Sequence, residues 1–256
     1  MAYSSLKIDV RRGRILEMLR RDGRVYVSQL SSLLEATPAT IRNDLAALEK
    51  DGCLERVPGG AVRKAQAEQN ASAARIERAA EKRAIAACMA AMVRDGDRLF
   101  INSGTTALAV AEALRARRAL HVVTNSLPVA ALLGAEPSFR VLMLGGVINA
   151  YGFTCGGDAQ EQLGRYRADW TVLAVDSVSA AGGVTTYHPD EAILNRQMIE
   201  RAARTVIVAD HTKIGRAGFA RFHPADSSVC LITDAAAAGP ELERLAKQGV
   251  EIRVAD

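Results

Sequence analysis

Apolar residues in the first quarter of the chain recur at helical spacing. The first stripe predicts a helix over Asp9–Asp22, which ends at Gly23 because glycine readily adopts the left-handed conformation that stops a helix. The next stripe predicts a short helix over Val27–Leu34, with Ser28 available as its N-cap. Both predicted helices therefore have an apolar face that points inward.

A third amphipathic helix is expected after a tight connection at residues 35–37. Thr37 is its N-cap, and Pro38 suits its first turn because proline already has a helical backbone angle. Its apolar positions lie four and then three residues apart, at Ile41, Leu45 and Leu48. Two short strands, over residues 53–57 and 61–63, follow with a Pro-Gly-Gly turn between them. Helix, helix, turn, helix and β-hairpin is the order of a winged helix-turn-helix.

Polar side chains at the start of the third helix face away from its apolar stripe. Arginine pairs bidentately with guanine and asparagine with adenine in the major groove, while hydroxyl and basic side chains bind the DNA backbone. The candidate DNA-binding residues are Ser28, Thr37, Thr40, Arg42, Asn43, Arg56, Arg63 and Lys64. A small helical module for protein interaction, with an exposed polar face, is the alternative that the pattern leaves open.

From residue 80 onwards, apolar runs typical of strands alternate with amphipathic helices. The expected strands are Arg98–Asn102, His121–Thr124, Arg140–Leu144, Thr171–Val175, Thr205–Ala209 and Val229–Thr233. The expected helices are Ala84–Val93, Thr106–Leu114, Leu127–Leu133 and Ala192–Ala203. Strands that are apolar throughout and separated by helices indicate a parallel sheet covered on both faces. We therefore predict an α/β chain with a winged-helix domain at 1–64, a linker at 65–79 and an α/β domain at 80–256.

Polar residues follow the predicted strands, where ligands bind in an open parallel sheet. Glycine and hydroxyl side chains before a helix suit a phosphate, because the first helical amides are free to donate to it. The candidate ligand-binding residues are Ser103, Gly104, Thr105, Thr106, Asn125, Ser126, Gly145, Gly146, Asp176, Glu191 and Lys213. Together they would form a polar pocket suited to a small phosphorylated polyol.

Lys213 is one of only six lysines among 33 basic residues. A lysine just after a strand, in a chain rich in arginine, indicates that this position requires a compact ammonium rather than a planar guanidinium. A surface lysine placed by chance is an equal alternative.

Composition and charge narrow the class of protein further. The chain has 256 residues, of which 49 % are hydrophobic and 24 % charged, and this excludes a mainly disordered protein. Residues 1–64 hold 12 basic and 8 acidic side chains and so carry the whole net charge of +4, which points to nucleic acid as the partner of this part.

Several other classes of protein are not expected. The four cysteines lack the spacing of a zinc site or a disulfide framework, so we expect no metal and reduced thiols. No apolar stretch is long enough to span a membrane, and no secretion signal opens the chain, which favours a cytoplasmic protein without a membrane partner. No nucleotide-binding or hydrolase motif occurs, and no cofactor is expected.

Several short segments, which follow one another in the same order along nearly the whole chain, resemble the DeoR family of bacterial transcriptional repressors, in its glycerol-3-phosphate-repressor-like branch. They are TPATIRNDL at 37–45, RVPGGA at 56–61, SGTT at 103–106, TNS at 124–126, LGG at 144–146, Gly182–Thr186 and DHTKIGR at 210–216. The resemblance implies a winged helix joined to a sensor domain similar in fold to ribose-5-phosphate isomerase. It also implies repression of a sugar or polyol catabolism operon, release from operator DNA by a phosphorylated sugar or polyol, and self-association as a homodimer or homotetramer.

The resemblance also assigns roles to residues of the sensor part. Thr105 and Thr106 match the family's phosphate loop, and Asn125 and Gly145-Gly146 match loops that line the pocket. The acid and the lysine of the cleft match Asp176 and Lys213. The chain departs from the family pattern at Asn43, Pro58, Ser177 and Asn195.

Two other functions remain to be weighed against a regulator. An aldose–ketose isomerase would use Asp176 as the general base, Lys213 to stabilise the enediolate and Glu191 as a second acid. An isomerase, however, has no use for an attached DNA-binding domain, so we expect no enzyme. A regulator whose sensor serves only for self-association is the third alternative, and the polar residues kept after the strands argue against it.

Overall fold

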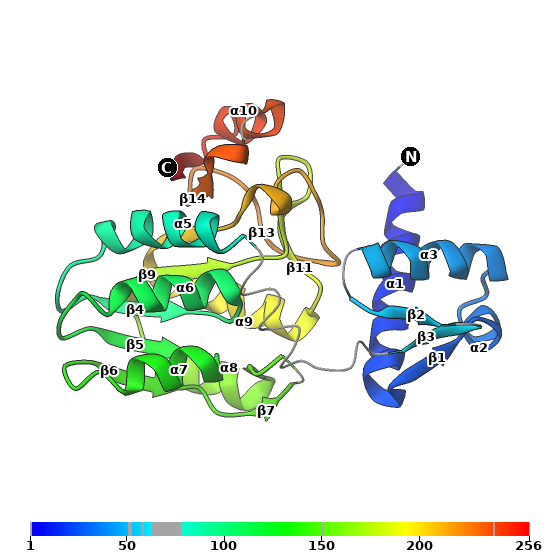
Figure 1. The fold of residues 1–256 in the computed structure, drawn as a ribbon, viewed down its shortest axis with the longest axis horizontal. Coiled ribbons are helices and arrows are strands. Elements are labelled where there is room, and N and C mark those ends of the chain that lie inside the picture. The colour runs from blue at the N-terminus through cyan, green and yellow to red at the C-terminus, as the bar shows by residue number, and fades with distance from the viewer. Residues whose placement is uncertain are drawn as a thin grey trace. The chain divides into compact units, whose positions relative to one another are not determined.

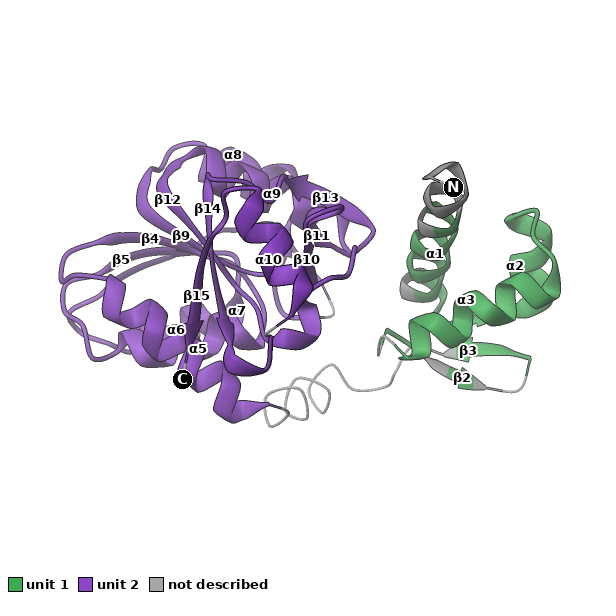
Figure 2. Ribbon diagram, turned by 90° about the horizontal axis from the view of Figure 1, so that it is seen from above, with its two compact units in different colours: residues 1–69 green, residues 70–256 purple. Residues whose placement is uncertain are grey.

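The computed structural model describes residues 2–50, 53–57, 59–62, 78–149, 151–237 and 239–255. The chain divides into two compact units, residues 1–69 and 70–256, each with its own core (Figures 1 and 2). Most of the predicted linker, residues 65–77, lies outside the described residues. Within the described part, no helix is both long and apolar enough to cross a membrane.

The described residues of the first unit form three helices and a three-stranded antiparallel sheet in the order β1-β3-β2. Its elements are α1 (Ala2–Asp22), β1 (Arg24–Tyr26), α2 (Val27–Leu33), α3 (Pro38–Lys50), β2 (Glu55–Val57) and β3 (Gly60–Val62). The predicted stripe of α3 is buried, and Ile41, Leu45 and Leu48 pack with Ile15 and Leu19 of α1. This arrangement confirms the predicted winged helix-turn-helix.

Three details of this unit differ from the prediction. The first helix begins at Ala2 rather than Asp9. Ser28 is not an N-cap, because α2 begins at Val27 directly after strand β1, and Tyr26 precedes it without a side-chain bond to the helix. Strand β1 was not predicted, since three residues are too few for a periodic pattern.

A buried carboxylate joins two of these helices. Asp44, on the inner face of α3, is almost fully buried and forms ion pairs with Arg11 and Arg12 of α1. Because two cations neutralise it, its burial does not carry the cost of an isolated charge. The pairs fix the position of α3 on α1 and leave the opposite face of α3 exposed.

The second unit is built on a seven-stranded parallel sheet in the order β15-β14-β12-β9-β4-β5-β6. Its strands are β4 (Arg98–Ile101), β5 (His121–Thr124), β6 (Arg140–Met143), β9 (Ala168–Ala174), β12 (Ala202–Val208), β14 (Val229–Asp234) and β15 (Glu251–Ala255). Two smaller antiparallel sheets contain β7 (Val147–Ile148), β8 (Thr154–Cys155), β10 (Ser177–Ser179), β11 (Gly183–Thr186) and β13 (Ala220–His223). The expected strands all lie in the parallel sheet, which confirms the predicted fold class.

Helices cover both faces of the parallel sheet (Figure 1). One face packs against α5 (Ala79–Met92), α6 (Thr105–Leu114) and α7 (Leu127–Gly134). The other packs against α8 (Gly157–Leu163), α9 (Pro189–Glu200) and α10 (Pro240–Lys247). Alternate residues of β9 serve the two cores, with Val172 in the first and Leu173 in the second. Two short 3-10 turns, η1 (His211–Lys213) and η2 (Ala235–Ala237), follow β12 and β14.

The predicted end of the helix over Ala192–Ala203 is wrong. In the structure α9 ends at Glu200 and β12 begins at Ala202, so residues expected to be helical form the start of a strand. Apolar and alanine residues continue across this junction without a glycine or proline, and the sequence therefore gives no stop signal there.

The strand order of the parallel sheet changes direction at β4. The chain runs outward from β4 through β5 to β6, returns to place β9 on the other side of β4, and continues outward through β12, β14 and β15. In such sheets the crevice at the carboxyl ends of the two strands where the order reverses is the usual place for a ligand. Here that crevice lies between the residues that follow β4 and those that follow β9.

Candidate functional site

The start of α3 presents polar groups on its exposed side. The Thr40 N–H donates to Thr37 Oγ1 at 3.1 Å, so Thr37 is the N-cap that the sequence predicts. The two threonine hydroxyls lie 2.8 Å apart. Arg42 and Asn43, one turn further on, are both exposed, opposite the buried stripe of this helix. Long donors on an exposed helix face match what a major groove accepts.

The other predicted DNA-binding residues lie outside α3. Ser28 is exposed on α2. Arg56 of β2 is held by Glu49 of α3, which accepts its backbone N–H at 2.9 Å and forms an ion pair with its guanidinium at 3.1 Å. Arg63 and Lys64, like the wing residue Pro58, lie outside the described residues. Arg56 would therefore have to leave an intramolecular partner to reach a DNA phosphate.

Sequence reasoning missed two side chains of the wing sheet. Arg24 and Tyr26 flank the buried Val25 on β1, and the Arg24 guanidinium lies 5.1 Å from the centre of the Tyr26 ring. Both are exposed beside β3. A basic residue next to an aromatic one was visible in the sequence, but without the strand nothing placed it on the wing.

In the second unit, the turn after β4 leads directly into α6. Gly104 has a φ of +122° and lies against Ala174, whose Cβ would be 3.1 Å from a side chain added to this glycine. The first amides of α6, at Thr105 and Thr106, have no acceptor within the helix and are free to bind an anion. Thr106 is buried and Thr105 half-buried. This turn has the form that the predicted phosphate site needs.

A chain of hydrogen bonds crosses the crevice from this turn to the end of β9. The Ser103 hydroxyl donates to Glu191 Oε1 at 3.0 Å. Thr186 Oγ1 lies 2.8 Å from Glu191 Oε2 and 2.9 Å from Asp176 Oδ2. Asp176 Oδ2 also accepts the Tyr187 N–H at 2.9 Å. The two predicted acids are thus brought together by one threonine hydroxyl.

The acid of α9 is the more perturbed member of this chain. Burial raises the pKa of Glu191, the charge of Asp176 raises it further, and the pKa reaches about 7 although Thr186 and Ser103 bond to the carboxyl group. Asp176 is only half-buried. At neutral pH the pair therefore has one carboxylate beside a group that is partly protonated.

Residues at the ends of β5 and β6 have structural partners. Ser126 Oγ accepts the Val129 N–H and caps α7. The Gly145 N–H donates to the Gln162 side chain at 2.9 Å, and Gly146 has a φ of +129° where an added Cβ would lie 2.7 Å from the Cys155 carbonyl oxygen. These two positions shape the loop rather than offering free groups.

Asn125 differs from them in having an unused acceptor. Its amide donates to the Thr154 carbonyl at 3.0 Å. Its own Oδ1 is buried and has no hydrogen-bond partner in the described part of the chain. This oxygen is a buried acceptor at the end of β5 that a donor could still satisfy.

The lysine of the predicted site lies on η1. Lys213 is half-buried, and among the described residues its ammonium group forms no ion pair. An isolated parallel bridge between Val178 and Ile214 places the segment that carries Lys213 alongside the segment that follows Asp176. The structure thus gathers the Ser103–Thr106 turn, the acid pair and the lysine segment at the carboxyl edge of the sheet.

Several residues near this edge were not predicted. Thr186 lies in a segment that the resemblance matched, yet nothing in the sequence gave it the bridging role. The rings of Tyr151, Phe153 and His188 form a cluster with centroids 5.0 to 6.5 Å apart, next to the residues that bond Asp176. Aromatic and polar residues in loops gave no periodic signal, so only the fold could bring them together.

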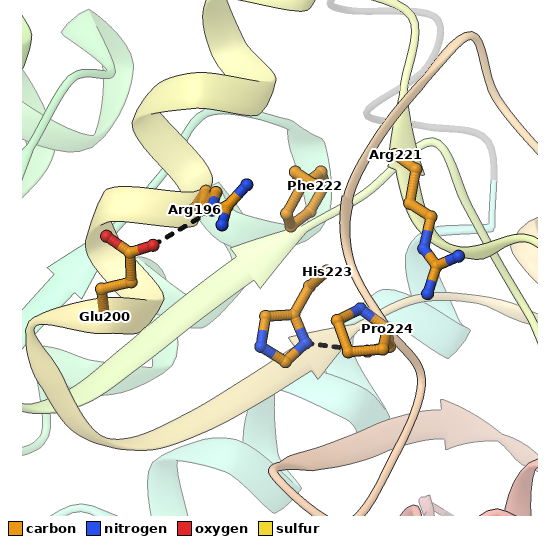
Figure 3. A pocket seen from close by; sticks show the side chains of 6 residues that line it. All are labelled: Arg196, Glu200, Arg221, Phe222, His223 and Pro224. Carbon is orange, nitrogen blue, oxygen red and sulfur yellow. Dashed lines mark hydrogen bonds and ion pairs between the residues drawn. The ribbon is translucent and has the colours of Figure 1, made fainter.

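A shallow hollow of about 300 Å³ lies elsewhere in this unit, between α9 and β13 (Figure 3). Its lining residues are Arg196, Glu200, Arg221, Phe222, His223 and Pro224. Arg196 is paired with Glu200, and the His223 Nδ1 donates to the Pro224 carbonyl oxygen (Figure 3). None of the predicted ligand-binding residues lines it. In the described residues no cluster of three acids, histidines or cysteines could hold a metal ion.

Two family models match the chain. Residues 11–67 match the DeoR-like helix-turn-helix domain, and residues 77–235 match the DeoR C-terminal sensor domain.

Curated proteins match over most of their lengths. A protein provisionally named the aga operon transcriptional repressor of Escherichia coli O157:H7 is 36 % identical, covering 94 % of this chain and 92 % of the relative. The glycerol-3-phosphate regulon repressor of Haemophilus influenzae is 32 % identical over 84 % of this chain and 85 % of its own length. The HTH-type transcriptional repressor CsqR of Escherichia coli is 30 % identical over 98 % and 97 %.

Among solved structures, ribose 5-phosphate isomerase A from Neisseria gonorrhoeae covers 52 % of this chain and of its own, with 18 % identity and a TM-score of 0.38. A TM-score this low supports no inference about activity. The curated relatives, in contrast, match over 85 % to 97 % of their own lengths and are named repressors, which confirms the prediction of a regulator rather than an enzyme. The chain therefore belongs to the DeoR family of transcriptional repressors.

Proposed function

We propose that this protein represses an operon for the use of a sugar or polyol and leaves its operator when a phosphorylated form of that compound binds the sensor domain. The functional division is the predicted one, with DNA binding in residues 1–64, a linker at 65–79 and effector binding in 80–256. One observation carries the proposal: a free helix N-terminus, an acid pair and a lysine segment meet at the switch point of the sensor sheet.

The DNA-binding role rests on α3. Arg42 and Asn43 are exposed donors near the start of this helix, while Thr37 is its N-cap and Thr40 lies in its first turn, where phosphate contacts are expected. Operators of helix-turn-helix proteins hold two half-sites related by symmetry, which a dimer or a tetramer of this chain would occupy. Both the operator and the effector would be met in the cytoplasm.

The effector role divides between a phosphate end and a polyol end. The free amides of α6 at Thr105 and Thr106 suit the phosphate, with Lys213 as the compact cation. Asp176 and the unpaired Asn125 Oδ1 are acceptors, and acceptors bind the hydroxyl groups of a polyol. Linkage requires the effector to prefer the form of the protein that binds DNA less well.

We infer that one ion pair at the same edge couples the effector site to the linker. Arg78, the last residue before α5, lies 3.7 Å from Asp210, which caps the η1 turn that carries Lys213. Arg78→Ala should leave the separate affinities for operator and effector nearly unchanged and lower the effector's release factor by up to roughly fivefold. The factor is measured by titrating operator into the protein with and without effector, and effector into the protein with and without operator. An unchanged factor would show that the Arg78–Asp210 pair does not couple the two sites.

Arg42→Ala should weaken binding to the operator by about 1–3 kcal/mol, or roughly 5- to 150-fold, and relax the base preference at one position. The reason is the loss of a bidentate contact to a base edge. Fluorescence anisotropy with operator and random duplexes at one salt concentration measures the effect, and Arg21→Ala, an exposed arginine paired with Asp22, is the control. An equal loss on both duplexes would assign Arg42 to the DNA backbone instead.

The proposed function is tested by adding phosphorylated sugars and polyols to the protein–operator complex. We expect one of them to bind the sensor and lower the operator affinity. A compound that binds the protein tightly and leaves the DNA affinity unchanged would contradict the proposed coupling.

A further inference from the structure

The bonds between Ser103, Glu191, Thr186 and Asp176 contain one proton too few if both acids are ionised. Thr186 Oγ1 lies within 2.9 Å of a carboxyl oxygen of each acid, but its single O–H can donate to only one of them. With two carboxylates, the second contact would set oxygen lone pairs 2.8 Å apart with no hydrogen between them. The pattern is satisfied when one acid carries a proton.

The remaining donors decide which acid this is. Asp176 Oδ2 already accepts the Tyr187 N–H, and Asp176 is half-buried, so an ionised Asp176 has both a donor and access to water. Glu191 is only 7 % exposed and has Ser103 as its other partner. A neutral Glu191 satisfies every bond: Ser103 donates to Oε1, Oε2–H donates to Thr186, and Thr186 donates to Asp176.

We propose that the ligand-free sensor holds Glu191 as a neutral carboxylic acid, which joins the Ser103–Thr106 turn to Asp176, and that loss of this proton weakens binding of an anionic group at the turn. The second half of this statement rests on the proposed effector site. A buried carboxylate at Glu191, added to the half-buried Asp176, would repel an anion at the turn, whereas a neutral acid does not. Glu191 is thus a positioning residue whose charge state sets the response of the site.

Other charged groups lie on α9 and on the elements packed against it, and Asp190, the residue before Glu191 on this helix, is exposed. Asp176 is the charged group that acts on Glu191, and the directions of burial and of this charge both favour the neutral form. His188, at the start of the same helix, has its ring against Tyr151 and Phe153. Arg196 and Glu200 lie at the other end of α9 itself, and Arg221 and His223 lie on β13 next to it (Figure 3).

Glu191→Gln is the sharpest variant because an amide repeats the bonds of a neutral acid: its oxygen accepts from Ser103 and its NH₂ donates to Thr186. Because the pKa of Glu191 is raised, its neutral form contributes to the stability of the folded state, and this contribution is complete below pH 4.5, the ordinary pKa of a glutamate. The contribution is lost as the pH rises through about 7. The wild type should therefore match the glutamine variant at pH 4 and have a lower unfolding midpoint at pH 8. Glu161→Gln, an exposed residue of α8, is the control and should show no such divergence.

Denaturant unfolding of the full-length protein across this pH range tests the proton itself. A glutamine variant that is less stable than the wild type at both pH values would overturn the proposal, because it would show that Glu191 acts as a charged acceptor. Thr186→Val should keep or widen the divergence between glutamate and glutamine, because burial and the charge of Asp176 still raise the pKa of Glu191 when the hydroxyl that lowers it is gone.

Calorimetry with inorganic phosphate as the probe tests the effect on binding. The ratio of affinities, Glu191→Gln to wild type, should rise above pH 7 by up to about tenfold per pH unit, and the ionisation of phosphate cancels in this ratio. A constant ratio would overturn the link between the proton and anion binding. Absence of phosphate binding in both proteins, with the unfolding profiles as expected, would reject the proposed effector site and leave the neutral Glu191 supported.

Discussion

Lys213→Ala should remove the response at effector concentrations that release the wild type and leave operator affinity unchanged. Lys213 lies on η1 beside the segment that follows Asp176. The turn between β4 and α6, with its free amides, lies at the same carboxyl edge of the sheet. A hydrogen bond between charged groups contributes about 1.5–3 kcal/mol, so losing the ammonium should weaken binding of a phosphorylated effector by roughly 10- to 150-fold. At effector concentrations that release the wild type, the variant should stay on the operator.

Lys247→Ala, on the exposed end of α10, is the matched control and should behave as the wild type. Anisotropy of labelled operator, with and without effector, measures both quantities for each variant. Loss of operator binding by Lys213→Ala without effector would show that the lysine supports the fold instead of the ligand.

Gly60→Ala should break the wing and remove specific DNA binding. A Cβ at Gly60 would lie 1.9 Å from the Val25 carbonyl oxygen, which belongs to the paired strand β1 and cannot rotate away. Strand β3 would have to leave β1, and we expect a cost of at least about 3 kcal/mol in the free energy of unfolding, the upper end for overpacking. The sensor unit has its own core and should keep its fold.

Gly59→Ala is the control for this substitution. Gly59 has a φ of +80° but open space around it, so alanine there should cost only about 1–2 kcal/mol of backbone strain. Denaturant unfolding followed by circular dichroism, together with operator anisotropy, compares the two variants. If alanine at 60 is tolerated as well as alanine at 59, the close approach of β3 to β1 is wrong.

The parts of the fold that sequence predicted are those with strong local patterns. Ile41, Leu45 and Leu48 marked the buried face of α3 and therefore its exposed face, and this placed Arg42 and Asn43 correctly on the outside. Six of the seven parallel strands were predicted, because their runs are apolar throughout. The edge strand β15 was missed, since most of its residues are not buried. Strand β1 and the small sheet of β10, β11 and β13 were missed, since their strands are short and their pairing is non-local.

The candidate site was predicted as a set of loops but not as a set of bonds. The rule that ligands bind at the carboxyl ends of parallel strands brought Ser103 and Asp176 to one edge from the sequence alone. The hydrogen bond between Ser103 and Glu191 joins residues 88 positions apart, and no spacing rule reports such a contact. The same holds for Arg56, whose pairing with Glu49 competes with its expected role at DNA phosphate.

The central claim is that one chain binds a specific operator through α3 and is released by a phosphorylated ligand at the sensor's switch point. The most direct measurement is fluorescence anisotropy with DNA from the region upstream of its own coding sequence, in excess random duplex, repeated with a panel of phosphorylated sugars and polyols. The account predicts specific binding that one compound releases in the wild type but not in Lys213→Ala. Binding no stronger than to random duplex, or release that persists in the lysine variant, would contradict it.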